Sequence, residues 1–225
     1  MARYVVVTVP LAVLAAKQIT FTPPLPLRKL QSIGRLGTAS MNKVVLHFRT
    51  AFWGGSGENI GVASPTGQHV WFYNATAVCK APVLVAFLVA DAAQAAEKLS
   101  DSSSVAQCMR MLRNAFRPTH VPEPAGSFVT RWDNDPFARG AYSFFKVGSS
   151  RADCEALSEP LGWRRLNVGF AGEATAMANM GSVLVRLICA WRHFVPNVFV
   201  IVTGGLAVRR GGSQANIEGD VTTYA

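Results

Sequence analysis

Hydrophobic and polar positions follow two different periods along this chain, which predicts that strands and helices alternate. Residues 4–9 are a continuous apolar, β-branched run, typical of a buried strand in a parallel sheet. From Leu27 to Leu36 an apolar residue recurs at every third position, which predicts a helix, and Gly37 is placed to cap its C-terminal end. The chain therefore begins as a strand followed by a helical segment.

The strand predicted at residues 43–48 alternates strictly between two faces. Lys43 falls on one face, and Val44 and Leu46 fall on the other. We expect Lys43 to lie on the inward face, where an ammonium must pair, lose its charge or meet a water-filled cavity. A lysine that extends from a strand end into solvent would explain the same pattern.

The remaining pattern predicts two separate strand systems. Further strands are expected at residues 70–73, 82–90, 127–132 and 165–170, and the run at 82–90 is apolar throughout, as in a buried central strand. Helices are expected at residues 91–98 and 102–116, the second of them capped by Asp101 or Ser102. The fold class is therefore α/β or α+β, with divisions near residue 40 and near residue 150.

The composition excludes a disordered chain, because 50% of the residues are hydrophobic and only 16% are charged. The net charge of +9 favours anionic partners such as nucleic acid, but no run of basic residues concentrates that charge. The apolar stretch at residues 184–208 carries Arg186, Arg192 and Pro196, which argue against a membrane span. We expect no membrane span, and we rank a nucleic-acid-binding module last.

The 4 cysteines are widely spaced and form neither a Cys-x-x-Cys pair nor a metal-binding cluster with histidine. Such cysteines are typical of reduced thiols in an intracellular protein. The sequence also offers no Ser-His-Asp set and no phosphate-binding loop with its lysine. Its chemistry must therefore come from other residues.

Three sequence blocks carry that chemistry. They are residues 41–48 (MNKVVLHF), 131–144 (RWDNDPFARGAYSF) and 170–175 (FAGEAT). In this order and at this spacing they resemble the C-terminal half of the FAD-dependent amine oxidases, which include the monoamine oxidases, the polyamine oxidases and the lysine-specific histone demethylases. The second block is most similar to the histone demethylase and polyamine oxidase branches. The resemblance covers residues 4–183.

The resemblance implies catalytic roles for Lys43 and Tyr142. Lys43 would lie beneath the flavin, hold a water beside its N5 and help oxygen to accept electrons. Tyr142 would form one wall of an aromatic slot in front of the flavin, where the amine binds. Without the resemblance, aromatic residues at this density are more often core than site.

The resemblance also implies FAD contacts for Trp132, Phe137, Glu173, Ser182 and Val183. Trp132 and Phe137 would support the flavin ring, and Glu173 would contact the ribityl and phosphate region. Ser182 and Val183 stand where the family has a Thr-Val pair at the start of its closing helix. Taken alone, an acid after a strand and a glycine is explained by helix capping.

In the terms of this family, the fold is a partial FAD-linked amine oxidase. Residues 1–40 and 150–183 would be pieces of the FAD-binding domain, residues 41–149 a substrate-binding domain with a mixed sheet, and residues 184–225 a tail unlike the family. The chain has no Gly-x-Gly-x-x-Gly turn. The absence of this turn leads us to expect a missing N-terminal half, and the likeness stops after Val183 as it would after a shifted or unspliced reading frame.

The expected activity is oxidation of a C–N bond in a secondary amine, with oxygen as acceptor and release of hydrogen peroxide. A polyamine or a methylated lysine is favoured over aromatic monoamines, for which a second tyrosine would be expected at position 182. The alternative is a non-catalytic, amine-oxidase-like fragment that acts as an interaction partner, because contacts to the adenosine half of FAD would be missing. Flavin absorbance of the purified chain discriminates between the two.

Overall fold

The computed structural model describes residues 4–54, 57–63, 69–163, 166–176, 180–181, 199–203 and 206–209. The chain divides into two compact units. Met1–Gly37 and Ser143–Ala225 form one of them, here called the discontinuous unit, and Thr38–Tyr142 form the other, here called the inserted unit. The expected divisions lie near residues 40 and 150, whereas the chain divides after Gly37 and after Tyr142.

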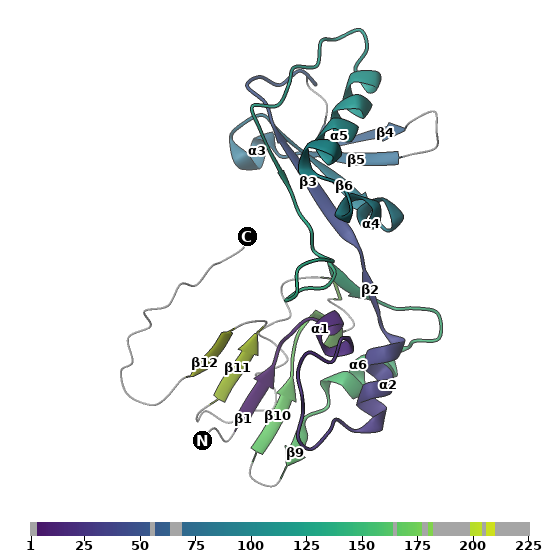
Figure 1. Cartoon of the computed structure of the whole chain (residues 1–225), viewed down its shortest axis with the longest axis vertical. Coiled ribbons are helices and arrows are strands. Elements are labelled where there is room, and N and C mark those ends of the chain that lie inside the picture. Colours follow the sequence, from purple (N-terminus) through teal and green to yellow (C-terminus); the bar gives the residue numbers. More distant parts are fainter. Residues whose placement is uncertain are drawn as a thin grey trace. The chain divides into compact units, whose positions relative to one another are not determined.

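The discontinuous unit contains a sheet with the strand order β12-β11-β1-β10-β9 (Figure 1). Its centre is β1 (Tyr4–Val7), which runs parallel to β10 (Leu166–Phe170) on one side and to β11 (Phe199–Thr203) on the other. The antiparallel edge strands are β9 (Leu161–Trp163) and β12 (Leu206–Arg209). The prediction of a buried parallel strand at the start of the chain is confirmed.

In the part of this unit that the structure describes, the α-helices are α1 (Leu11–Ala15), α2 (Leu27–Arg35) and α6 (Arg151–Ser158). Helices α2 and α6 lie side by side (Figure 1). The core between helices and sheet consists of Val7, Val9, Leu11, Val13, Leu25, Ile33, Leu36, Cys154, Leu157, Val168, Phe170 and Ala174. The end of β10 and the turn that follows it are therefore packed into this core, through Phe170 and Ala174.

Helix α2 exists as predicted, but its apolar spacing does not mark the buried face. Leu27 is 70% exposed and Leu30 is 42% exposed, while Lys29 and Ser32 are buried beside Ile33. The physical reason is that α2 meets α6 through polar groups. The Ser32 hydroxyl and the Arg35 guanidinium both donate to the carboxylate of Asp153, at 3.2 and 2.7 Å.

Gly37 does not cap α2, contrary to expectation. Leu36, the residue after the helix, is already extended, and Gly37 begins β2 (Gly37–Ala39). A side chain at position 37 would place a Cβ atom 2.6 Å from two ring carbons of Phe144. A larger residue would therefore displace the Phe144 ring, so Gly37 allows this close packing and does not form a left-handed cap.

The inserted unit is built on an antiparallel sheet with the order β4-β5-β6-β3-β7. Its strands are β3 (Met41–His47), β4 (Asn59–Ala63), β5 (His69–Asn74), β6 (Val83–Val89) and β7 (Gly126–Val129). Strand β6 is central, as predicted. A two-stranded sheet of β2 and β8 (Tyr142–Phe144) stands where the chain passes between the units.

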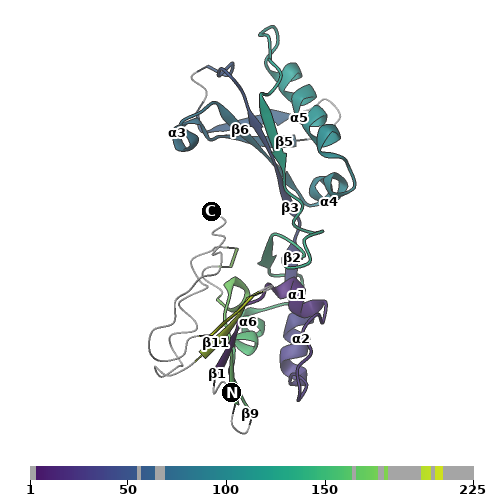
Figure 2. The ribbon, with the colours of Figure 1, turned by 60° about the vertical axis from the view of Figure 1, so that its left-hand side comes forward.

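The helices of the inserted unit are α3 (Thr76–Cys79), α4 (Asp91–Glu97) and α5 (Asp101–Ala115). Helix α5 packs on one face of the sheet (Figure 2). Its Cys108, Met109 and Leu112 side chains join a core with buried side chains of the strands. That core consists of Val44, Leu46, Phe48, Trp53, Val62, Val70, Phe72, Leu84, Ala86, Cys108, Met109, Leu112, Val121 and Val129.

The start of α5 and the end of β7 differ from the sequence prediction. Helix α5 is capped by Ser100, whose hydroxyl accepts a hydrogen bond from the Ser103 amide at 3.2 Å, and not by Asp101 or Ser102. The strand expected to reach Trp132 ends at Val129. Among the described residues, no helix combines the length and the apolar character that crossing a membrane requires.

Candidate functional site

Lys43 lies on the face of the inserted sheet that α5 does not cover. Val44 and Leu46 are fully buried on the α5 side, and Lys43 is exposed on the opposite side. The predicted alternation is therefore confirmed, but the expectation that Lys43 faces inward is wrong, because the helix covers the other face. The Lys43 ammonium lies 5.7 Å from the centre of the Phe87 ring, within the range of a cation–π interaction.

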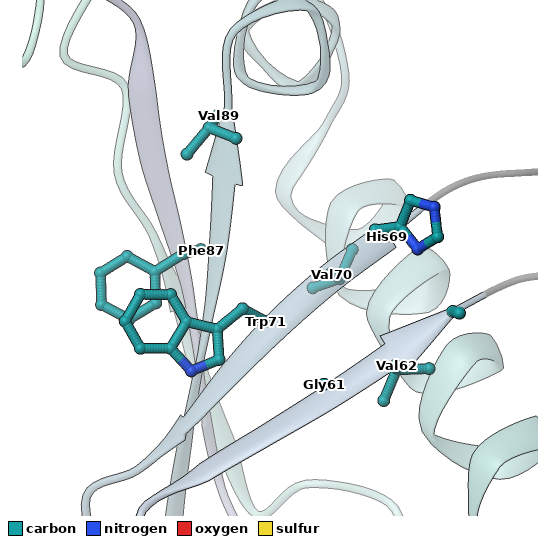
Figure 3. A pocket seen from close by; sticks show the side chains of 8 residues that line it. Gly61, Val62, His69, Val70, Trp71, Phe87 and Val89 are labelled. Carbon is teal, nitrogen blue, oxygen red and sulfur yellow. The ribbon is translucent and has the colours of Figure 1, made fainter.

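A depression with an aromatic lining, formed by β4, β5 and β6, shares Phe87 with the Lys43 contact. Trp71 and Phe87 stack with ring centres 4.9 Å apart and planes inclined by 22° (Figure 3). The Trp71 indole N–H donates to Asn59 at 3.0 Å, which fixes the ring. The depression measures about 440 Å³ and is lined by Gly61, Val62, Ala63, His69, Val70, Trp71, Phe87 and Val89. Aromatic faces of this kind suit a cation or an amine.

The segment with Trp132 and Phe137 is a surface turn. The Gly140 amide donates to the Trp132 carbonyl at 3.0 Å and closes the turn, and the Phe137 amide donates to the Asp135 carboxylate at 2.8 Å. Trp132 is 36% exposed and Phe137 is 57% exposed, so these rings are not part of a core. Their assignment to flavin support stays a prediction.

Hydrogen bonds join this turn to the strand that carries Lys43. The Lys43 amide donates to the Thr130 hydroxyl at 2.8 Å, and the Thr130 amide donates to the Lys43 carbonyl at 3.0 Å. The Trp132 amide donates to the side chain of Asn42 at 3.0 Å. Tyr142 follows the turn as a half-buried residue at the start of β8. The catalytic roles of Lys43 and Tyr142 stay predictions.

Glu173 belongs to the discontinuous unit, in the turn η1 (Glu173–Thr175) that follows β10. Gly172 before it has a φ of +142°, a conformation that favours glycine. The Glu173 carboxylate accepts hydrogen bonds from the Ser143 hydroxyl at 2.5 Å, the Ser143 amide at 3.3 Å and the Gly181 amide at 2.8 Å. Glu173 therefore ties three chain segments together and does not act as a simple helix cap.

The position of Glu173 fits a role in holding FAD. It lies beyond the carboxyl end of β10, a strand parallel to β1, and ligands of open parallel sheets bind at such ends. A carboxylate has about four acceptor positions, so its oxygens can still accept from a ribityl hydroxyl beside Ser143 and Gly181. The two other cofactor residues expected from the sequence, Ser182 and Val183, lie outside the described residues.

The sequence analysis missed one residue of this region, Asn42. It is fully buried on the same side of β3 as Val44 and Leu46. The alternation of β3 could have identified Asn42, because position 42 lies on the same face as Val44 and Leu46. A polar side chain on an apolar face must find hydrogen-bond partners. Within the described residues, no group of three histidine, cysteine or acidic side chains could hold a metal ion.

The two units define a class of protein: a sheet with parallel central strands, interrupted in sequence by an antiparallel sheet that presents a lysine beside an aromatic ring. Residues 1–184 match the family described as "Flavin containing amine oxidoreductase". The chain belongs to this family.

The chain is similar in sequence to proteins named as lysine-specific histone demethylases. It is 37% identical over 204 residues to "Lysine-specific histone demethylase 1 homolog 3" of Arabidopsis thaliana, covering 89% of this chain and 12% of the relative. It is 36% identical over 181 residues to "Lysine-specific histone demethylase 2" of Homo sapiens, covering 77% of this chain and 22% of the relative. The chain thus spans about a fifth or less of these relatives.

Solved structures share the fold. A putrescine oxidase bound to putrescine matches with a TM-score of 0.63 and 24% identity, over 79% of this chain and 38% of that chain. A cyclohexylamine oxidase from Brevibacterium oxydans matches with a TM-score of 0.54 and 22% identity, over 76% of this chain and 37% of that one. The chain therefore has part of the fold of the FAD-dependent amine oxidases.

Proposed function

We propose that this chain supplies the substrate-binding part and a portion of the FAD-binding part of an amine oxidoreductase that acts on methylated lysine or on a polyamine. The observation that carries the proposal is Lys43 beside an aromatic depression, in a chain of the flavin-containing amine oxidoreductase family. The names of the relatives favour methylated lysine. FAD, when bound, would accept a hydride from the carbon next to the amine nitrogen and return the electrons to oxygen, giving hydrogen peroxide.

The residues of the chain divide this work. Trp71 and Phe87 offer aromatic faces to an alkyl amine, whose charge the rings attract on approach. The Lys43 ammonium lies 5.7 Å from the centre of the Phe87 ring. It supplies a fixed positive charge that stabilises negative charge forming on oxygen. Glu173 would accept a hydrogen bond from the ribityl chain, and Trp132, Phe137 and Tyr142 would line the ring.

Flavin retention and amine turnover test this proposal. The purified chain is incubated with FAD and desalted, and its absorbance and peroxide release are measured with a dimethyl-lysine peptide, spermine and benzylamine. We expect retained flavin and turnover of the first two amines. Lys43→Met should slow reoxidation by oxygen at least about tenfold, on the order of 1.4 kcal/mol in the barrier. Lys80→Met, the same change at another exposed lysine of the inserted unit, should leave it unchanged.

A colourless protein that releases no peroxide would contradict this proposal. It would favour the second candidate, a non-catalytic amine-oxidase-like protein that acts through a partner. The observation behind that candidate is that the sequence contains no Gly-x-Gly-x-x-Gly turn to contact the adenosine half of FAD. A location inside the cell is also part of our proposal, because Cys79, Cys108 and Cys154 are free thiols.

A further inference from the structure

Asn42 is a buried amide whose two ends are both bonded. Its Oδ1 atom accepts from the Thr130 hydroxyl at 3.0 Å and from the Trp132 amide at 3.0 Å. Its Nδ2 atom donates to the Glu97 carboxylate at 2.7 Å. One side chain thus joins β3, the end of α4 and the beginning of the Trp132 turn, and its amide orientation is fixed by donors on one side and an acceptor on the other.

Glu97 extends the same network to the next residue of the turn. The oxygen that accepts from Asn42 also accepts from the Asp133 amide at 3.1 Å. The Asp133 carboxylate in turn accepts from the Ser40 hydroxyl at 2.6 Å. Three successive contacts, at Thr130, Trp132 and Asp133, therefore fix the turn to β3 and α4 immediately beside Lys43. Such a network is costly to break, because its members are partly or fully buried.

We propose that Asn42 is a positioning residue of the site: its buried amide sets where the Trp132 turn lies relative to Lys43. Asn42 contacts no reacting group, and its effect reaches the site through Trp132. The consequence for ligand binding rests on the function proposed above, in which Trp132 supports the flavin ring. The positioning itself does not rest on that function and can be measured in the protein alone.

The first test uses the 5 tryptophans as reporters. The chain is labelled with 5-fluorotryptophan, and the Trp132 resonance in the ¹⁹F NMR spectrum is assigned by its loss in Trp132→Phe. In Asn42→Asp the donor to Glu97 is lost and two carboxylates face each other. We expect the Trp132 resonance to shift and narrow toward the position of a solvent-exposed ring, while the other resonances stay in place. Asn114→Asp, the same change at an exposed residue of α5, should leave all resonances unchanged.

A compensating variant separates this role from a general loss of stability. In Asn42→Asp with Glu97→Gln, the glutamine amide can donate to the new aspartate, and the repulsion is gone. The Trp132 resonance should return most of the way, though not fully, because the Asp133 amide loses its acceptor. An unchanged Trp132 resonance in Asn42→Asp, or an equal shift of every tryptophan, would overturn the proposal.

Thr130 provides an independent variant if Asn42→Asp does not fold. Thr130→Val keeps the shape but removes the hydroxyl between the Lys43 amide and Asn42, whereas Thr130→Ser keeps the hydroxyl. We expect the valine variant to shift the Trp132 resonance and the serine variant to leave it in place. Equal spectra for the two variants would overturn the proposal.

A titration with FAD then connects positioning to function. The dissociation constant should rise about fivefold to tenfold in Asn42→Asp and equally in Trp132→Ala, and the double variant should show no further rise, because both act through one ring. Additive effects would overturn the route through Trp132. Absence of FAD binding in the unchanged chain would count against the proposed function, while the ¹⁹F spectra would still decide the role of Asn42.

Discussion

Lys29 is a charged side chain at the centre of a helix contact, with only 2% of its surface exposed. Its ammonium donates to the carbonyls of Ala156, Leu157 and Glu159 at 2.7 to 2.8 Å. These carbonyls lie at the C-terminal end of α6, where they lack partners within the helix and where a positive charge is favoured. The ammonium also lies 4.1 Å from the centre of the Phe170 ring.

The environment of Lys29 predicts a specific dependence of stability on pH. Burial lowers the pKa of Lys29 from 10.5 to about 8, while the charge of nearby Glu159 acts in the opposite direction. Between these two values the unfolded chain binds more protons than the folded chain, so the contribution of Lys29 to stability rises as the pH rises from 8 toward 10.5. Urea unfolding at several pH values should show this rise in the unchanged chain and its loss in Lys29→Met.

The control for this experiment is Lys98→Met, which removes an exposed lysine and should keep the pH dependence. A Lys29→Met variant with the same slope as the unchanged chain would mean that Lys29 titrates normally in the folded state.

Sequence patterns could predict the surroundings of some residues of the site and of the core but not of others. The alternation around Lys43 was predictable, because period two follows from strand geometry alone. The burial of Lys29 was not predictable, because its hydrogen-bond partners are backbone carbonyls far away in the sequence. Ala156, for example, lies 127 residues after Lys29. Asn42 could have been found, since its position on the apolar face of β3 demanded a partner.

At the scale of elements, the start of α5 shows how local chemistry selects a boundary. A helix leaves its first amides without partners, and the nearest side-chain oxygen that can turn back captures one of them. Ser100 has the extended backbone of a cap residue and accepts from the Ser103 amide, whereas Asp101 already lies within the helix. A run of serines offers several candidate caps, so the sequence alone could not choose between them.

The cap makes a testable difference between neighbouring serines. Ser100→Ala should lower the free energy of unfolding by about 1 kcal/mol, the usual cost of removing an N-cap hydroxyl. Ser102→Ala removes the same atom two residues later and should change it by less than about 0.5 kcal/mol. Chemical denaturation of both variants is the measurement, and equal losses would show that Ser100 is not the cap.

At the scale of the whole molecule, each unit has its own core. The core of the inserted unit draws all its residues from Thr38–Tyr142, and the core of the discontinuous unit draws none from that range. The sequence predicted two strand systems because their hydrophobic patterns differ, a continuous run in β1 and an alternation in β3. The sequence could not locate the boundary between the units to a single residue, because β2 and β8 each contain residues of both units.

Separate cores predict separate responses to core mutations. Leu84→Ala in the central strand β6 should cost about 2–5 kcal/mol and speed amide hydrogen exchange within residues 38–142. Leu157→Ala in α6 should do the same for the discontinuous unit. Exchange measured by mass spectrometry distinguishes the two, and faster exchange in both units from either variant would show a single cooperative core.

The two ends of the inserted unit lie next to each other in space, because the Ala141 amide donates to the Ala39 carbonyl at 2.9 Å. Its two ends are therefore already joined by a hydrogen bond, and the entire inserted sheet can be exchanged as one unit. Grafting the equivalent segment of another amine oxidase at Thr38 and Tyr142 needs no new linker. If the function proposed above holds, such a graft transfers selectivity for one amine over another while the parallel strands and the Glu173 turn keep their own sequence.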